Sequence, residues 1–186
     1  MTRAGRLVVM AALVFVAGGP LVAQGRGPRP TVTSLSGDVT EDWQSQKDLI
    51  INAANAMPED KFTYKSTPAQ RDFAAQVMHI VGANRMLLGT LGGKTPAPAI
   101  NMKATSKADV MIALRQVYDY GEAVVKEFSD AQLVERITPP SFMGPQASRV
   151  RVIYAALSHT NDIYGQIVVY LRLNGITPPA SVRPGI

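Results

Sequence analysis

The sequence of 186 residues contains no cysteine and only two histidines. Without a thiol the chain forms neither disulfides nor cysteine-ligated metal sites, and it lacks a thiolate nucleophile and a lipoprotein anchor. Strand signals are also lacking, because no run alternates between apolar and polar residues between two turns. No segment repeats at a fixed period. These absences favour a helical domain in which few side chains could act as catalytic groups or metal ligands.

The net charge is too small to indicate a nucleic-acid partner. The chain carries 19 basic and 14 acidic residues, a formal charge of +5, and Arg3 and Arg6 lie at the extreme N-terminus. The other basic residues are scattered and form no stripe along the chain. We therefore expect no nucleic-acid binding.

The N-terminus has the layout of a secretory signal peptide over residues 1–23. Arg3 and Arg6 precede an apolar run at 7–17, a Gly-Gly-Pro break follows, and Ala23 offers a small residue for cleavage. The apolar run is too short to span a bilayer, which disfavours the alternative of an uncleaved anchor. We expect export to the periplasm or extracellular space without membrane attachment after cleavage. Residues 24–37, rich in Gly, Pro, Ser and Thr, are predicted to form a flexible tether.

Residues 38–186 are predicted to form one all-α domain. The spacing of apolar residues predicts a first helix over about 39–56 and a second from Thr67-Pro68 to about residue 91. A third helix is expected to start at Thr105 or Ser106, and Gly121 on its apolar seam indicates a close approach by a neighbouring group. A short helical turn is expected after Ser129.

A glycine-rich stretch ending in Gly93, Lys94 and Thr95 only superficially resembles a phosphate-binding loop. Such a loop needs a glycine five positions before Gly93, where this chain has Leu88. It also connects a strand to a helix, whereas this stretch follows a predicted helix. We therefore expect no nucleotide site here.

The last helix, beginning at Arg149, is the most informative stretch. Its apolar residues cover more than half of the circumference, as expected for a helix that packs against several neighbours. Gly175 is predicted to end the helix, and Pro178-Pro179 prevents its continuation. One edge of the buried side carries four stacked side chains where an inward-facing site would lie: His159, Ile163, Gln166 and Tyr170.

Three motifs resemble the DinB-like superfamily. They are Ala-Ala-x-x-Met-Pro after the first helix, QVMHIVGAN around His79, and His159-x-x-x-Ile163-Tyr-Gly-Gln followed by YLRLNGITPP. The resemblance implies a four-helix bundle and a homodimer. It also implies a divalent metal held by three histidines, one on the second helix and two on the last. The second histidine of the last helix is replaced here by Ile163.

The resemblance leaves His79 and His159 as the metal ligands, for zinc, nickel or iron. Catalytic sites of this kind use three protein ligands and keep one position open, so a third donor is needed. Asp162 lies about 60° away from the line of His159 and Ile163 on a helix, and Gln166 is better aimed but is a poor ligand for transition metals. Two further donors are considered: Asn161 and Glu122.

Two functions therefore stay open. The first is an exported, metal-dependent hydrolase or transferase that acts on a small molecule at an incomplete histidine site. The second is a non-catalytic bundle that binds a small apolar molecule or a partner protein and holds no metal. In the second case the two histidines are packing residues with hydrogen-bond partners on the bundle. The expected partners are Gln76, Thr160, Gln166 and Tyr170.

Overall fold

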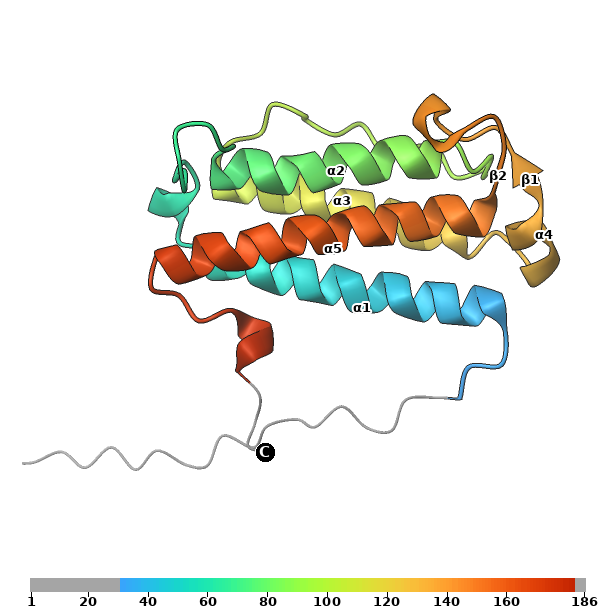
Figure 1. Cartoon of the computed structure of the whole chain (residues 1–186), viewed down its shortest axis with the longest axis horizontal. Coiled ribbons are helices and arrows are strands. Elements are labelled where there is room, and N and C mark those ends of the chain that lie inside the picture. The colour runs from blue at the N-terminus through green and yellow to red at the C-terminus, as the bar shows by residue number, and fades with distance from the viewer. Residues whose placement is uncertain (1–30, 183–186) are drawn as a thin grey trace, which may run out of the picture.

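The computed structural model describes residues 31–182, so the predicted signal peptide and residues 24–30 of the predicted tether lie outside the described residues. Four long helices form the body of the domain (Figure 1): α1 (Leu35–Ala56), α2 (Phe73–Gly89), α3 (Lys107–Val125) and α5 (Arg149–Leu173). The shorter elements lie in the connections between them: η1 (Glu59–Lys61), α4 (Asp130–Val134), β1 (Arg136–Ile137), η2 (Ser141–Met143), β2 (Ala147–Ser148) and η3 (Pro179–Ser181).

The four long helices form a bundle in which α1 and α2 each pack against both α3 and α5. Helices α2 and α3 run in the same direction, because the connection between them passes back along the length of α2 (Figure 1). A contact at the helix ends gives the relative direction of α2 and α5. The Arg149 side chain at the start of α5 donates a hydrogen bond of 2.9 Å to the Leu91 carbonyl just after α2. Helices α2 and α5 therefore run antiparallel and lie side by side.

Each long helix begins at a polar cap. The side-chain oxygens of Ser34, Asp72, Ser106 and Ser148 accept hydrogen bonds from backbone N–H groups of the first helical turns. Such caps satisfy donors that have no partner within the helix, and each stabilises its helix by about 1 kcal/mol. The predicted cap at Ser106 is confirmed.

Two predicted helix starts are wrong. Helix α2 begins at Phe73 and not at Thr67-Pro68, because the carbonyl of Thr67 accepts from the Gln70 N–H in a separate turn. Helix α1 begins at Leu35, inside the stretch that was expected to be tether as far as residue 37. Its N-terminus is held by the Asp130 carboxylate, which accepts hydrogen bonds from the backbone of Leu35 and Ser36. The sequence pattern alone does not bring these distant segments together.

The end of α5 agrees with the sequence prediction. Gly175 has φ +72, and its N–H donates to the Arg172 carbonyl, while the Ile176 N–H donates to the Leu171 carbonyl. This is the Schellman arrangement that glycine favours after a helix.

One feature of the connections was not predicted. Strands β1 and β2 form an antiparallel ribbon of two residues each, which is too short to show the alternation that identifies a strand in sequence.

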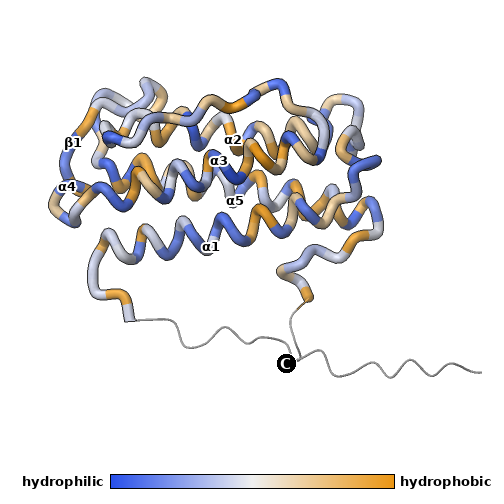
Figure 2. Tube along the Cα trace, turned by 180° about the vertical axis from the view of Figure 1, so that it is seen from behind, coloured by the Kyte–Doolittle hydropathy of each residue, from blue (hydrophilic) through white to orange (hydrophobic). Residues whose placement is uncertain are grey.

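The centre of the core is a contact between Trp43 of α1 and Gly121 of α3. Hydrophobic residues recur along the long helices between hydrophilic ones (Figure 2). Trp43 is fully buried. A Cβ atom added to Gly121 would lie 2.1 Å from the Trp43 ring. The Trp43 indole N–H donates to the Tyr118 carbonyl at 3.0 Å, which fixes the ring. The close approach predicted at Gly121 is confirmed, and the group involved is an aromatic side chain.

Within residues 31–182, none of the helices combines the length and the hydrophobicity that crossing a membrane requires.

We predict that Gly121→Ala lowers the free energy of unfolding by about 1–3 kcal/mol, because the methyl group overpacks the Trp43 ring. Gly165→Ala is the matched control, since a Cβ on this exposed glycine of α5 meets no atom within 4 Å. The control should be neutral or stabilise by up to about 1 kcal/mol, because alanine favours helix over glycine. Urea unfolding followed by circular dichroism measures both. Equal stability of the two variants would contradict this account of the core.

Candidate functional site

The structure brings the two histidines of the chain together. His79 on α2 and His159 on α5 are both half-buried, and their ring centroids lie 4.9 Å apart with an angle of 81° between the ring planes. The antiparallel packing of α2 and α5 places them opposite each other. Their binding of a metal remains a prediction, but the shared location that it requires is present.

The two imidazoles form one end of a cavity of about 560 Å³ between α2 and α5. The connection from α2 to α3 contributes Met102, and η2 contributes Phe142, which is 69% exposed. Apart from the imidazoles, every side chain that lines the cavity is apolar. The lining residues are Met78, His79, Gly82, Ala83, Met86, Leu87, Met102, Phe142, Ala155 and His159.

The position expected to supply a further histidine is occupied by a packed aliphatic residue. Ile163 lies one helical turn after His159 and is only 3% exposed. Its side chain belongs to the hydrophobic core and has no atom that can ligate a metal. The imidazole pair therefore stands next to a hydrocarbon surface.

Asp162 and Gln166, the first two candidates for a third donor, bond to each other. The Gln166 side-chain amide donates to the exposed carboxylate of Asp162 at 3.2 Å. The oxygen of the same amide accepts from the Gln76 side chain at 2.5 Å. A carboxylate can only accept hydrogen bonds, so this series of hydrogen bonds fixes the orientation of both side-chain amides. It leaves the side-chain oxygen of Gln76 without a partner among the described residues. Among the described residues, Asp162 does not join the two histidines in a cluster of three or more His, Cys, Asp or Glu side chains suited to a metal ion.

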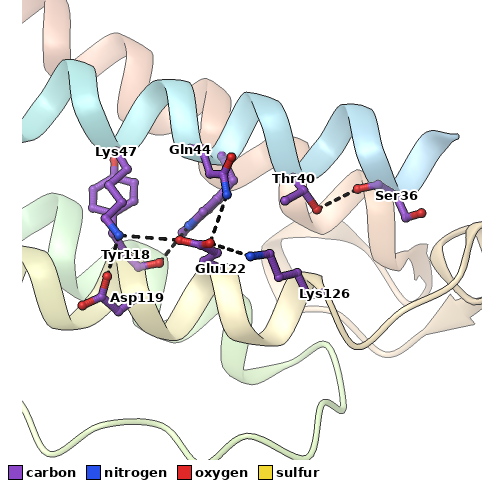
Figure 3. Close-up of polar contacts among 9 residues, drawn as sticks. Ser36, Thr40, Gln44, Lys47, Tyr118, Asp119, Glu122 and Lys126 are labelled. Atoms are coloured by element: carbon purple, nitrogen blue, oxygen red, sulfur yellow. Dashed lines mark hydrogen bonds and ion pairs between the residues drawn. The ribbon is translucent and has the colours of Figure 1, made fainter. Parts of the chain in front are cut away.

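The other two candidates lie elsewhere in the bundle. Asn161 accepts a hydrogen bond from Gln46 of α1 at 3.1 Å and lines a separate cavity between α1 and α5. Glu122 lies at the contact of α1 with α3, where its carboxylate accepts from Gln44 and Lys126 (Figure 3). Both side chains therefore bond at contacts of α1, and the structure does not bring them to the imidazole pair at the contact of α2 with α5.

The histidines also lack the hydrogen bonds expected of ordinary packing residues. Within the part of the chain that the structure describes, neither imidazole has a hydrogen-bond partner on the protein. The four expected partners bond to other groups: Gln76 and Gln166 to each other, Thr160 to Asn84, and Tyr170 to the Arg71 carbonyl. The ring nitrogens are therefore available to a molecule or ion in the cavity.

The surroundings of His79 favour its neutral imidazole form. Burial is the largest cause that lowers the pKa of His79 from its usual 6.5, and the positive charges of Arg71 and His159 lower it further. Neutral imidazole is the form that ligates metals and that carries both a hydrogen-bond donor and an acceptor.

The helical spacing places Met86 near His79, in agreement with the structure, whereas Met78 and Met102 were not expected at the imidazoles. The helical pattern places Met78 on the outer side of α2, whereas the structure buries it to 6% exposure beside the cavity. Met102 lies in a connection, where periodicity gives no information about direction. Met86 could be placed because it lies seven residues after His79, on the same face of the helix.

The glycine-rich stretch at 92–95 holds an internal carboxylate. Glu127, just after α3, accepts hydrogen bonds from the backbone N–H groups of Lys94 and Thr95 and from the Thr95 hydroxyl. These donors are therefore already satisfied by the protein.

Fold and site together define a four-helix bundle with an imidazole pair in a cavity between its second and last long helices. Residues 43–167 match the family model of the DinB superfamily, and the chain belongs to this family. The YjoA protein of Bacillus subtilis, which is uncharacterized, is 20% identical over 144 residues, covering 76% of this chain and 92% of YjoA.

Solved structures show the same fold at low sequence identity. A DinB-like protein from Bacillus cereus has a TM-score of 0.67 and 19% identity, covering 82% of this chain and 97% of its own. The structure of YjoA has a TM-score of 0.61 and 17% identity, with 75% and 93% covered. YfiT from Bacillus subtilis has a TM-score of 0.60 and 12% identity, with 82% and 95% covered. YfiT is described as a probable metal-dependent hydrolase with an unusual four-helix bundle topology.

We predict that Arg71→Gln raises the pKa of His79 toward 6.5, because it removes a positive charge that opposes protonation. Arg151→Gln, at an exposed arginine of α5 that does not affect His79, should leave this pKa unchanged. Nuclear magnetic resonance titration of the imidazole signals measures both.

Folding lowers the pKa of His79, so the folded state favours the neutral imidazole. The stability that this preference contributes is present above pH 6.5 and is lost as the pH falls through the lowered pKa of the folded state. A titration that gives His79 a pKa above 6.5 in the unmodified protein would contradict the account of its surroundings.

Proposed function

We propose that the protein binds a small, mainly apolar molecule in the cavity between α2 and α5. The observation that carries the proposal is the cavity itself, with about 560 Å³ of space and apolar walls that meet two imidazoles at one end. Ligand pockets in proteins typically have about 300–1,000 Å³, largely apolar walls and a few polar groups that orient the ligand. This cavity combines all three properties.

The lining indicates the chemistry of the ligand. Methionine side chains adapt their shape to a bound molecule, and three of them surround the space. The imidazoles of His79 and His159 offer the only polar side chains, and neutral imidazole both donates and accepts hydrogen bonds. The ligand that fits has an apolar body and one polar group directed at the imidazole pair.

The donor set does not fit the catalytic metal sites of three protein ligands that the family resemblance implies. Ile163 is buried in hydrocarbon, and residues 31–182 hold no cluster of three or more His, Cys, Asp or Glu side chains suited to a metal ion. Metal-bound histidines usually donate their second ring N–H to a carboxylate or carbonyl, and neither imidazole has such a partner here. A ligand pocket is therefore the better proposal.

Filling the cavity tests this function. Ala155→Phe places an aromatic ring in the space, so binding of an apolar fluorescent probe such as anilinonaphthalene sulfonate should weaken by about tenfold or more, as expected when a packed contact is lost. Ala123→Phe, at an exposed position of α3 away from the cavity, is the matched control and should bind the probe normally. Equal probe affinity of the two variants would show that the probe does not enter this cavity, and the proposal would fail.

A second candidate is a metal-dependent hydrolase or transferase with zinc, nickel or iron. Two neutral imidazoles on one metal have ring centroids about 5 Å apart when the ligand angle is tetrahedral and the bonds are about 2.0–2.1 Å. The observed separation of 4.9 Å matches this spacing. The description of YfiT as a probable metal-dependent hydrolase supports the same chemistry for a relative. Here water or a substrate atom would have to supply the remaining ligands.

We predict that Ile163→His creates a site that takes up about one zinc or nickel ion per chain, because three ligands are then available. The unmodified protein should retain less than about 0.1 of these ions per chain after gel filtration, since a two-imidazole site lacks the third ligand. Metal analysis of protein purified without a histidine tag measures both. Stoichiometric zinc or nickel in the unmodified protein would instead favour the metal-dependent enzyme.

We also propose export and self-association. Export is supported by the signal-like pattern of residues 1–23. A homodimer is supported by the family resemblance and by large apolar side chains on the surface of the helices, including Ile112, Val169 and Leu173.

A further inference from the structure

The separate cavity between α1 and α5 has a volume of about 420 Å³ and shares no lining residue with the cavity beside the imidazole pair. Helices α1 and α5 lie side by side and run in the same direction (Figure 1). Each contributes one face to the cavity, with residues at spacings i, i+3, i+4 and i+7. Most of the lining side chains are polar: Asp42, Ser45, Gln46, Tyr154, Ser158 and Asn161.

A buried amide in the wall of this cavity is held in one orientation. The Gln46 side chain is only 5% exposed, and its nitrogen donates to the Leu157 carbonyl at 2.8 Å and to the Asn161 side-chain oxygen at 3.1 Å. Because a carbonyl oxygen can only accept, these two bonds fix the orientation of both amides. Among the described residues, the Asn161 nitrogen has no hydrogen-bond partner, so its N–H groups are available to a molecule in the cavity.

The other end of the cavity combines negative charge with an aromatic ring. Burial is the largest cause that raises the pKa of the Tyr154 hydroxyl, and the negative charges of Asp42 and Asp38 raise it further. Both carboxylates therefore act on the same end of the cavity. Tyr154 is 44% exposed, so its ring is accessible to a molecule that enters from solvent.

These groups indicate the chemistry of a ligand. An ammonium group is attracted both by a carboxylate and by the face of an aromatic ring. An anionic group is disfavoured, because Asp42 lines the cavity and none of the described lining residues is a lysine or an arginine. A wholly apolar molecule is disfavoured as well, since it would cover the amide and hydroxyl groups without giving them partners.

We propose that the cavity between α1 and α5 binds a small organic ammonium compound. The cationic group lies beside Asp42 and Tyr154, and a hydroxyl or carbonyl group of the ligand bonds to Ser45, Ser158 or Asn161. The volume of the cavity suits a molecule of this kind. This site goes beyond the proposed binding of an apolar molecule between α2 and α5 and does not depend on it.

Titration with choline, followed by nuclear magnetic resonance of the backbone amides, tests the proposal. Choline should shift the signals of the residues that line this cavity, with a dissociation constant of about 1 mM, as expected for a few weak contacts. Its neutral isostere 3,3-dimethyl-1-butanol has the same shape without the charge. This alcohol should bind about fivefold more weakly or worse, because it lacks the attraction of the cation to the carboxylate and the ring.

Two pairs of variants identify the groups that hold the cation. Asp42→Asn should weaken choline binding by about twofold to fivefold, the effect of one exposed charge pair. Asp60→Asn, at an exposed carboxylate of η1 outside the cavity, is the matched control and should bind normally. Tyr154→Leu should weaken binding by a similar factor of about two to five, whereas Tyr154→Phe keeps the ring and should bind like the unmodified protein.

The substituted side chains are exposed, so the variants are compatible with folding, which circular dichroism verifies. The proposal is overturned if choline shifts no signal of the lining residues, or if the neutral alcohol binds as tightly as choline. It is also overturned if Asp42→Asn and Asp60→Asn have equal affinity for choline, or if the leucine and phenylalanine variants of Tyr154 do.

Discussion

The antiparallel contact of α2 with α5 is the constraint on which the site depends. It is held at one end by the hydrogen bond from Arg149 to the Leu91 carbonyl, and at the other by the bond from the Tyr170 hydroxyl to the Arg71 carbonyl. Between these two bonds the helices cannot slide by a turn without losing both. The register therefore places His79 opposite His159, although the two residues are far apart in the chain.

Ile163 places a buried hydrophobic side chain one helical turn from His159. Ile163 fills a position beside the imidazole pair with core hydrocarbon, while the carboxylates and amides of neighbouring positions bond elsewhere. The cavity next to the pair is retained, and its walls are methionine and other apolar side chains. The bundle thus combines a packed core at Ile163 with open space beside the imidazole pair, because the two features depend on different side chains.

The long connection from α2 to α3 has a structural and a chemical role. It returns the chain along α2, so that α2 and α3 run in parallel (Figure 1), and it is held near its start by the Glu127 carboxylate. On the way it places Met102 over Gly82, next to the cavity. A short turn between antiparallel helices would have no residue at this place. The topology therefore supplies part of the cavity wall.

Local physical chemistry in the sequence determined the all-α fold, most helix ends and the special position of Gly121, because periodicity, caps and glycine act over a few residues. The resemblance of the motifs to the DinB-like superfamily identified His79, His159 and the replacement at Ile163. Only the tertiary structure decided that α1 starts at Leu35 against Asp130, that Asn161 and Glu122 face other contacts, and that Met102 joins the imidazoles. Those facts depend on how distant segments pack, which spacing along one helix does not specify.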